Sequence, residues 1–121
     1  MTTRILIADD SVSLRAMLMA TLTSAGFDVV EAVDGSDAVA KAIKCKPNLV
    51  ITDLNMPGMN GVQVIRELRA DPGFKFTPIL MLTTESQEMR KLEGKQAGAT
   101  GWIVKPFRPD QLISVIRRVL G

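Results

Sequence analysis

The fold is decided by a stretch that reads ILIADDSVSLRAMLMATLTSAG at residues 5–26. Its first four residues form an unbroken apolar run, which is typical of a strand buried on both faces of a parallel sheet. Apolar residues then recur at helical spacing over residues 12–25, with Asp10 or Ser11 as candidate N-cap and Gly26 as the stop. The stretch therefore predicts one strand followed by one helix, with acidic residues at the junction. The apolar stripe expected to face the core is Leu14, Met17, Leu18 and Leu22.

The same alternation continues to the end of the chain. Further strands are expected at residues 29–33, 49–52, 79–82 and 102–104, and further helices at residues 36–44, 62–69, 86–96 and 110–120. The run at 29–33 contains Glu31 and fits an edge strand. The helix at 86–96 is the weakest, because it is polar and Gly94 costs about 1 kcal/mol relative to alanine. The order βαβαβαβαβα predicts an α/β fold, a doubly wound five-stranded parallel sheet with five helices, as one domain over residues 1–121.

The composition narrows the class of protein. The 121 residues are 46% apolar and 23% charged, which suits one globular domain and excludes a disordered chain. The net charge is only +2 and the basic residues are scattered, so nucleic-acid binding is not expected. No apolar run approaches the roughly 18 to 20 residues that cross a bilayer, so membrane insertion is not expected either. Cys45 is the only cysteine and histidine is absent, which favours the cytoplasm and excludes His-dependent hydrolases and His-ligated metal sites.

Polar residues follow four of the five predicted strands. Asp9 and Asp10 follow the first strand, Asp53 the third, Thr83 the fourth and Lys105 the fifth. Because the carboxyl ends of parallel strands meet at one edge of a sheet, we expect these side chains to converge. Three carboxylates and one lysine sum to a charge of −2, which a divalent cation balances. A ligand set limited to oxygen favours Mg²⁺ over Zn²⁺.

Each of these residues also has an ordinary structural explanation. Asp10 fits a helix cap, Asp53 fits a strand-end acid satisfied by turn amides, and one of Thr83 and Thr84 fits the cap of the next helix. Lys105 fits an ordinary surface lysine. Together these explanations require several coincidences at one edge, so we favour a phosphoryl-transfer site. A carboxylate beside Mg²⁺ and a lysine can become an aspartyl phosphate, with the Thr83 hydroxyl donating to a phosphoryl oxygen.

Four segments together resemble one known family. They are Asp9-Asp10, residues 53–61 (DLNMPGMNG), residues 82–85 (LTTE) and residues 97–107 (AGATGWIVKPF). In this order they resemble the receiver domain of bacterial two-component response regulators over essentially the whole chain. The likeness is greatest to single-domain chemotaxis regulators of the CheY type. The resemblance implies the flavodoxin-like (CheY-like) fold with strand order 2-1-3-4-5.

The resemblance also implies a role for each acidic residue. Asp53 matches the residue that accepts a phosphoryl group from a partner histidine kinase. Asp10 and Asp53 resemble direct Mg²⁺ ligands, and the backbone carbonyl of Asn55 resembles another. Asp9 resembles the acid that holds the metal through water. Asn55 and Glu85 match positions that modulate dephosphorylation in the family.

A conformational switch is implied as well. Thr83 and Lys105 match the hydroxyl and the lysine that engage the phosphoryl group, and the bond from Lys105 to Pro106 matches one that is cis in the family. The family couples the hydroxyl to an aromatic residue three positions before the lysine. That residue is Trp102 here, where tyrosine or phenylalanine is usual. The output face expected from the fourth helix, fifth strand and fifth helix includes Met89, Lys91, Trp102 and Arg108.

These features predict a stand-alone response regulator rather than an enzyme with an external substrate. We expect it to take a phosphoryl group from a histidine kinase and then bind a target in chemotaxis or motility, such as the flagellar motor switch. A phosphatase is a further expected partner. The alternative from another class is a small aspartyl-nucleophile phosphatase, which needs an acid two residues after the nucleophile, where this chain has Asn55. A phosphate sink, a phosphorelay shuttle and an unphosphorylated scaffold domain also stay open.

Overall fold

The computed structural model describes residues 2–84 and 88–121. Its strands form one five-stranded parallel sheet in the order β2-β1-β3-β4-β5. The strands are β1 (Arg4–Ala8), β2 (Asp28–Ala32), β3 (Leu49–Asp53), β4 (Ile79–Thr83) and β5 (Gly101–Val104). The predicted fold class and strand order are confirmed, and each strand end lies within one residue of its expected position.

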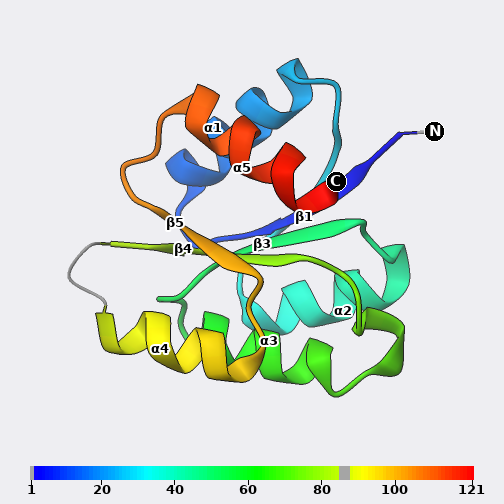
Figure 1. Ribbon diagram of the computed structural model, residues 1–121, viewed down its shortest axis with the longest axis vertical. Helices are drawn as coiled ribbons and strands as arrows, with labels where there is room; N and C mark the ends of the chain where they lie inside the picture. Colours follow the sequence, from blue (N-terminus) through cyan, green and yellow to red (C-terminus); the bar gives the residue numbers. More distant parts are fainter. Residues whose placement is uncertain (1, 85–87) are drawn as a thin grey trace.

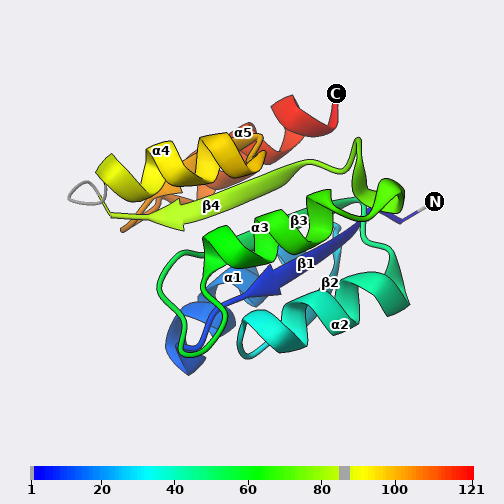
Figure 2. The ribbon, with the colours of Figure 1, turned by 90° about the horizontal axis from the view of Figure 1, so that it is seen from below.

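Helices cover both faces of the sheet. They are α1 (Val12–Ser24), α2 (Gly35–Cys45), α3 (Gly61–Arg69), α4 (Glu88–Ala97) and α5 (Pro109–Leu120), with a short 3₁₀ helix, η1 (Pro72–Phe74), after α3. Figure 1 shows α1 and α5 on one face and α2, α3 and α4 on the other. Figure 2 shows α3 lying between α2 and α4, and it contacts both. The sequence pattern did not predict η1, and the expected start of α4 at residues 86–87 lies outside the described residues.

Polar side chains define the helix starts. The hydroxyl of Ser11, one of the two candidate caps of α1, accepts a hydrogen bond from the backbone of that helix. Asp34 caps α2, and Asn60 forms a capping box with Gln63 at the start of α3. Gly26 follows α1 with a φ of 94°, a conformation that favours glycine. The local signals at these helix ends therefore match the structure.

The core consists of two apolar layers, one on each face of the sheet. Alternation along β1 divides its residues between them, since Ile5 and Ile7 pack toward α1 and α5 whereas Leu6 packs toward α2 and α3. β3 and β4 are buried along their whole length, which explains their unbroken apolar runs. β2 lies at an edge and is partly exposed, as the presence of Glu31 predicted.

The structure corrects one local expectation in α1 and shows the surroundings of a glycine in α4. Met17 was expected on the inward stripe of α1, but it is 55% exposed. Leu18 and Leu22 face the core, and Met17 lies about 100° around the helix from Leu18. Gly94 is buried in α4, and a Cβ at this position would meet Sδ and Cε at the flexible end of the Met81 side chain on β4. The cost of this glycine to the helix stays a prediction.

Candidate functional site

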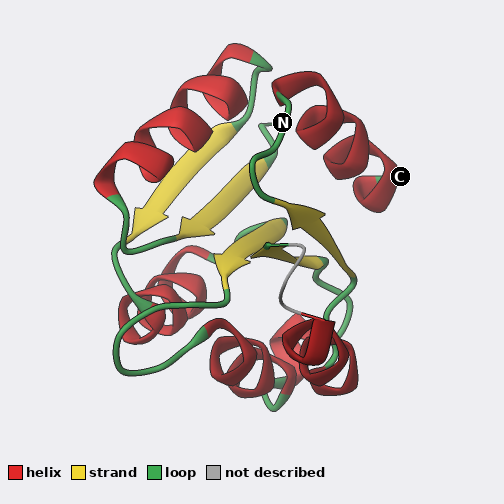
Figure 3. Ribbon diagram, turned by 90° about the vertical axis from the view of Figure 1, so that its left-hand side faces the viewer, coloured by secondary structure: helices red, strands yellow, loops and turns green. Residues whose placement is uncertain are grey.

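The predicted site residues lie together at the edge where the strands end. Figure 3 views the molecule from this side. Asp9 follows β1, Asp53 ends β3, Thr83 ends β4 and Lys105 follows β5. One carboxylate oxygen from each of Asp9, Asp10 and Asp53 lies within 4.8 Å of the other two. The convergence expected from the strand ends is therefore present in the fold.

The two carboxylate oxygens of Asp9 have different surroundings. Asp9 is fully buried, and its Oδ1 accepts the N–H of Ser11 at 2.8 Å. Its Oδ2 is buried and has no hydrogen-bond partner within residues 2–84 and 88–121. A buried polar atom without a partner is costly, so Oδ2 indicates a further ligand at this position.

Ser11 caps α1, so the interpretation of Asp10 as the helix cap is wrong.

Asp53 is held by one amide and by a lysine. Its Oδ2 accepts a hydrogen bond from Nζ of Lys105 at 3.0 Å, and its Oδ1 accepts the N–H of Asn55 at 3.3 Å. Asp53 is 4% exposed, and burial strengthens the attraction between the two charges. Lys105 is therefore not an ordinary surface lysine. Turn amides account for only part of the environment of Asp53.

The electrostatics of the cluster favour a cation. Burial raises the pKa of Asp9 to about 6, and the negative charge of Asp53 adds to the rise, whereas the N–H of Ser11 and the charge of Lys105 oppose it. A divalent cation would favour the ionised form of all three acids. The donors are oxygens only, and Oδ2 of Asp9 is free to contribute, so the residues fit Mg²⁺. The residues that would hold it are Asp9, Asp10 and Asp53, and the carbonyl of Asn55 stays an expectation from the resemblance.

A glycine brings the loop after β3 close to Asp53. The N–H of Gly61 donates to the carbonyl of Leu54 at 3.1 Å. A Cβ at position 61 would overlap the backbone carbonyl of Asp53, so a larger residue would push the start of α3 away from the site. Sequence reasoning missed this role, although the pair Asn60-Gly61 is the signal that could have revealed it.

The two predicted switch residues differ in exposure. Thr83 is fully buried, and its hydroxyl donates to the carbonyl of Thr84 at 3.2 Å. Trp102 is 43% exposed, and the ammonium of Lys91 lies 6.0 Å from the centre of its ring, within the range of a cation–π contact. The indole is thus displayed on the surface beside α4. Glu85, predicted to modulate dephosphorylation, lies outside the described residues.

Arg15 is a residue that sequence reasoning missed. Its Nη1 donates to the backbone carbonyl of Asp9 at 2.6 Å, and its Nε lies 3.4 Å from Oε1 of Glu31 on β2. Its side chain is only 12% exposed. A single arginine within a helix has no sequence pattern that indicates such a contact, so only the fold reveals it.

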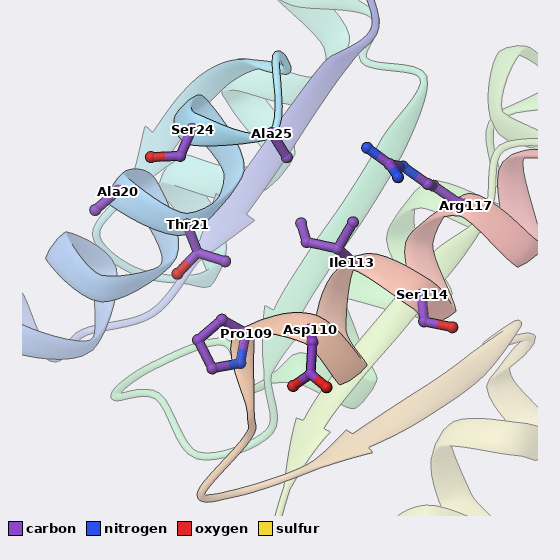
Figure 4. A pocket seen from close by; sticks show the side chains of 9 residues that line it. All are labelled: Ala20, Thr21, Ser24, Ala25, Pro109, Asp110, Ile113, Ser114 and Arg117. Atoms are coloured by element: carbon purple, nitrogen blue, oxygen red, sulfur yellow. The ribbon is translucent and has the colours of Figure 1, made fainter.

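Neither a groove along α1 nor an apolar hollow beside Lys105 includes the acidic cluster. A groove of about 840 Å³ runs between the C-terminal half of α1 and α5, and Figure 4 shows the side chains that line it. A smaller, mainly apolar hollow of about 350 Å³ lies beside Lys105. None of the three acids lines either space. The lining residues of the smaller hollow are Leu14, Met17, Thr84, Lys105, Pro106 and Phe107.

Comparisons with known proteins identify the family. The model of the response regulator receiver domain matches residues 5–117. The chemotaxis response regulator CheY4 of Vibrio cholerae superposes with a TM-score of 0.93 at 47% identity, covering 98% of this chain and 99% of that chain. Protein PilH of Pseudomonas aeruginosa is 40% identical over 118 residues, which is 98% of each chain. The DNA-binding response regulator MtrA of Mycobacterium tuberculosis is 42% identical over 114 residues, 94% of this chain and 49% of MtrA.

This chain therefore belongs to the response regulator receiver domain family, which confirms the resemblance seen in the sequence. It spans about half the length of curated relatives such as MtrA. The receiver domain of the sensor histidine kinase PA1611 from Pseudomonas aeruginosa is 27% identical, with a TM-score of 0.93 over 100% of this chain and 99% of that one. That structure is described with a magnesium ion coordinated in its active site cleft. Within the described residues, helices fall short of the length and apolar character that a membrane span requires.

Proposed function

We propose that the protein accepts a phosphoryl group from a histidine kinase onto Asp53 in a Mg²⁺-dependent reaction. The observation that carries this proposal is the 3.0 Å contact between Nζ of Lys105 and Oδ2 of Asp53, beside the cluster that includes Asp9 and Asp10. The lysine supplies positive charge next to one carboxylate, while the other two acids leave a cation site between them and Asp53. Membership of the receiver family supports a histidine kinase as the phosphodonor.

The proposed reaction is a transfer between two nucleophiles. A carboxylate oxygen of Asp53 attacks the phosphorus of a phosphohistidine, and the N–P bond breaks with its electron pair returning to the imidazole of the donor. Lys105 balances charge on the phosphoryl oxygens, and Thr83 offers a hydroxyl from the neighbouring strand end. Bound Mg²⁺ would neutralise further phosphoryl charge. The phosphoryl group stays on the protein as a signal, so we regard the protein as a phosphoacceptor rather than an enzyme with an external substrate.

The face formed by α4, β5 and α5 is the proposed output surface. Met89 is 71% exposed on α4 and Trp102 is 43% exposed on β5. Thr83 pairs in register with Val104, two residues after Trp102 on the adjacent strand. In this proposal, movement of the Thr83 hydroxyl toward a phosphoryl group changes the position of the Trp102 indole through the adjacent strands β4 and β5. A change in the position of Trp102 would alter what this face binds.

The downstream role is proposed from the relatives that match over their full length. CheY4 is described as a chemotaxis response regulator, and PilH matches this chain over 98% of each protein. We infer a role in chemotaxis or motility, with a target protein such as the flagellar motor switch and a phosphatase that resets the signal. The cytoplasm is the compartment in which a histidine kinase and a free cysteine such as Cys45 would both be expected.

The proposal is tested by phosphorylating the protein with a histidine kinase and Mg²⁺. An acyl phosphate on Asp53 should be labile to acid and to hydroxylamine, and Asp53→Asn should abolish its formation. Asp110→Asn, which changes an exposed acid on α5, is the matched control and should incorporate phosphate like the parent. Hydroxylamine-sensitive phosphate retained by Asp53→Asn would falsify the assignment of the acceptor.

A further inference from the structure

Arg15 lies at the junction of three elements that meet beside the acidic cluster. Its Nη1 donates to the carbonyl of Asp9 at 2.6 Å, directly after β1, while its Nε faces Glu31 on β2 at 3.4 Å. The side chain itself belongs to α1 and is 12% exposed. A guanidinium suits this position because its rigid plane fixes the direction of the Nη1 donor, while Nε makes only an ion-pair contact with Glu31 and no hydrogen bond within the described residues.

The carbonyl that Arg15 holds belongs to the peptide bond between Asp9 and Asp10. A peptide group is planar, so fixing its oxygen also fixes the direction in which the chain leaves for Asp10. The N–H of Asp9 is held from the other side by the carbonyl of Ala32 at 3.2 Å. Asp10 is exposed and receives little support from packing, so its placement depends on this backbone.

We propose that Arg15 is a positioning residue for the cation site: by holding the carbonyl of Asp9, it sets the peptide that carries Asp9 and Asp10 at the geometry that Mg²⁺ requires. This inference rests on the proposed function, because it concerns the same acidic cluster. Arg15 does not contact the cation or the phosphoryl group in this account. Its effect passes through the backbone, with Glu31 restraining the other edge of the guanidinium.

Two other roles for Arg15 predict different results. If Arg15 acted only through its positive charge, its removal would strengthen Mg²⁺ binding, because a cation near the acids repels another cation. If Arg15 only stabilised the fold, its loss would lower the free energy of unfolding and leave the Mg²⁺ affinity unchanged. Positioning predicts weaker Mg²⁺ binding, which is opposite in sign to the charge effect.

The experiment measures the Mg²⁺ dissociation constant from backbone amide shifts in an NMR titration, with urea unfolding of each Mg²⁺-free variant in parallel. Arg15→Gln should raise the dissociation constant about tenfold, the order seen when residues supporting metal ligands are removed. Arg15→Lys keeps the charge and most of the apolar stem, but it loses the Nη1 donor that the planar guanidinium directs at the carbonyl of Asp9. It should still raise the constant by about threefold or more.

Arg4 provides a matched control at the opposite end of β1. It donates from Nη1 to the carbonyl of Cys45 at 3.1 Å and from Nε to Asp28 on β2 at 3.0 Å, so like Arg15 it joins a backbone carbonyl to an acid on β2. Arg4→Gln should lower stability without changing Mg²⁺ affinity. Arg15→Lys with the affinity of the parent, or Arg15→Gln with equal or tighter binding, would overturn the inference while leaving the phosphoacceptor proposal intact. A parent protein that binds no Mg²⁺ would instead contradict the proposed function itself.

Discussion

Nζ of Lys105 lies 3.0 Å from Oδ2 of Asp53, although 52 positions separate the two residues in the sequence. The contact joins the loop after β5 to the end of β3, and β4 lies between these strands in the sheet. The partners differ in exposure, since the side chain of Asp53 is 6% exposed and that of Lys105 is 24% exposed. The lysine therefore reaches inward to a nearly buried carboxylate, which leaves the acid paired on one side and facing the acidic cluster on the other.

Removing this ammonium should slow phosphorylation without preventing folding. We expect Lys105→Ala to reduce the rate of phosphate incorporation by a factor on the order of 100, as for loss of one donor that stabilises a developing charge. Lys105→Arg should also impair the reaction, because a planar guanidinium does not replace a compact ammonium. Stopped-flow labelling with a phosphorylated kinase measures the rate, and Lys41→Ala on α2 is the control. Parent-like rates in Lys105→Ala would count against the role of the lysine.

The Mg²⁺-free protein should become less stable as Asp9 ionises between about pH 4 and pH 6. Burial raises the pKa of Asp9 from 3.8 to about 6 in the folded state, so the folded protein binds more protons than the unfolded chain in this window. Its free energy of unfolding therefore falls as pH rises, by on the order of 2 to 3 kcal/mol from this group.

Urea unfolding across this pH range tests the effect when the parent is compared with Asp9→Asn, which removes the titrating group. The comparison is needed because other acids act in the opposite direction. Asp37, for example, has its pKa lowered by the N–H of Val33. The stability difference between the two proteins should grow in favour of Asp9→Asn as pH rises. A difference that stays constant from pH 4 to pH 7 would contradict the raised pKa.

Gly61→Ala should destabilise the protein and disturb the site together. The added methyl group would overlap the carbonyl of Asp53, so the start of α3 must move. We expect a loss of about 2 kcal/mol or more in the free energy of unfolding, together with weaker Mg²⁺ binding. At Gly101 the same substitution meets only ordinary contact with Leu80, so Gly101→Ala is the control. Equal stability of the two variants would show that the loop adapts without cost.

Trp102 should report occupation of the site, because it is the only tryptophan in the chain. Its ring is 43% exposed, so an inward turn would shift its emission to the blue and reduce quenching by acrylamide. We expect this response to beryllofluoride, a phosphoryl mimic, with Mg²⁺ in the parent and not in Thr83→Ala. Emission that is unchanged at saturating beryllofluoride would show that Trp102 does not take part in the conformational switch. It would not affect the assignment of Asp53 as the acceptor.

The fold could be predicted because its information is local. The runs at β3 and β4 are apolar throughout since both faces of these strands are covered, and the acids appear where the strands stop. Parallel strands then bring their carboxyl ends to one edge regardless of side-chain detail. The positions of Asp53 and Lys105 beside each other follow from that topology.

The features that sequence reasoning missed depend on contacts between distant segments. Gly94 has a poor helix propensity, and only the fold reveals that this position faces the end of the Met81 side chain on another element. Arg15 is an unremarkable helical residue until the end of β1 places the carbonyl of Asp9 within its reach. The sequence placed Met17 on the wrong face because apolar residues occur on several sides of α1. The stripe that faces the core is therefore weakly marked in the sequence.

The most direct test of the account is to locate the acyl phosphate. After phosphorylation with Mg²⁺, hydroxylamine converts an aspartyl phosphate to a hydroxamate, and peptide mass spectrometry identifies the modified residue. We predict the hydroxamate at Asp53 and its absence when EDTA replaces Mg²⁺. A hydroxamate at Asp9 or Asp10, or equal modification in EDTA, would contradict the central claim that three acids bind the cation while one of them accepts the phosphoryl group.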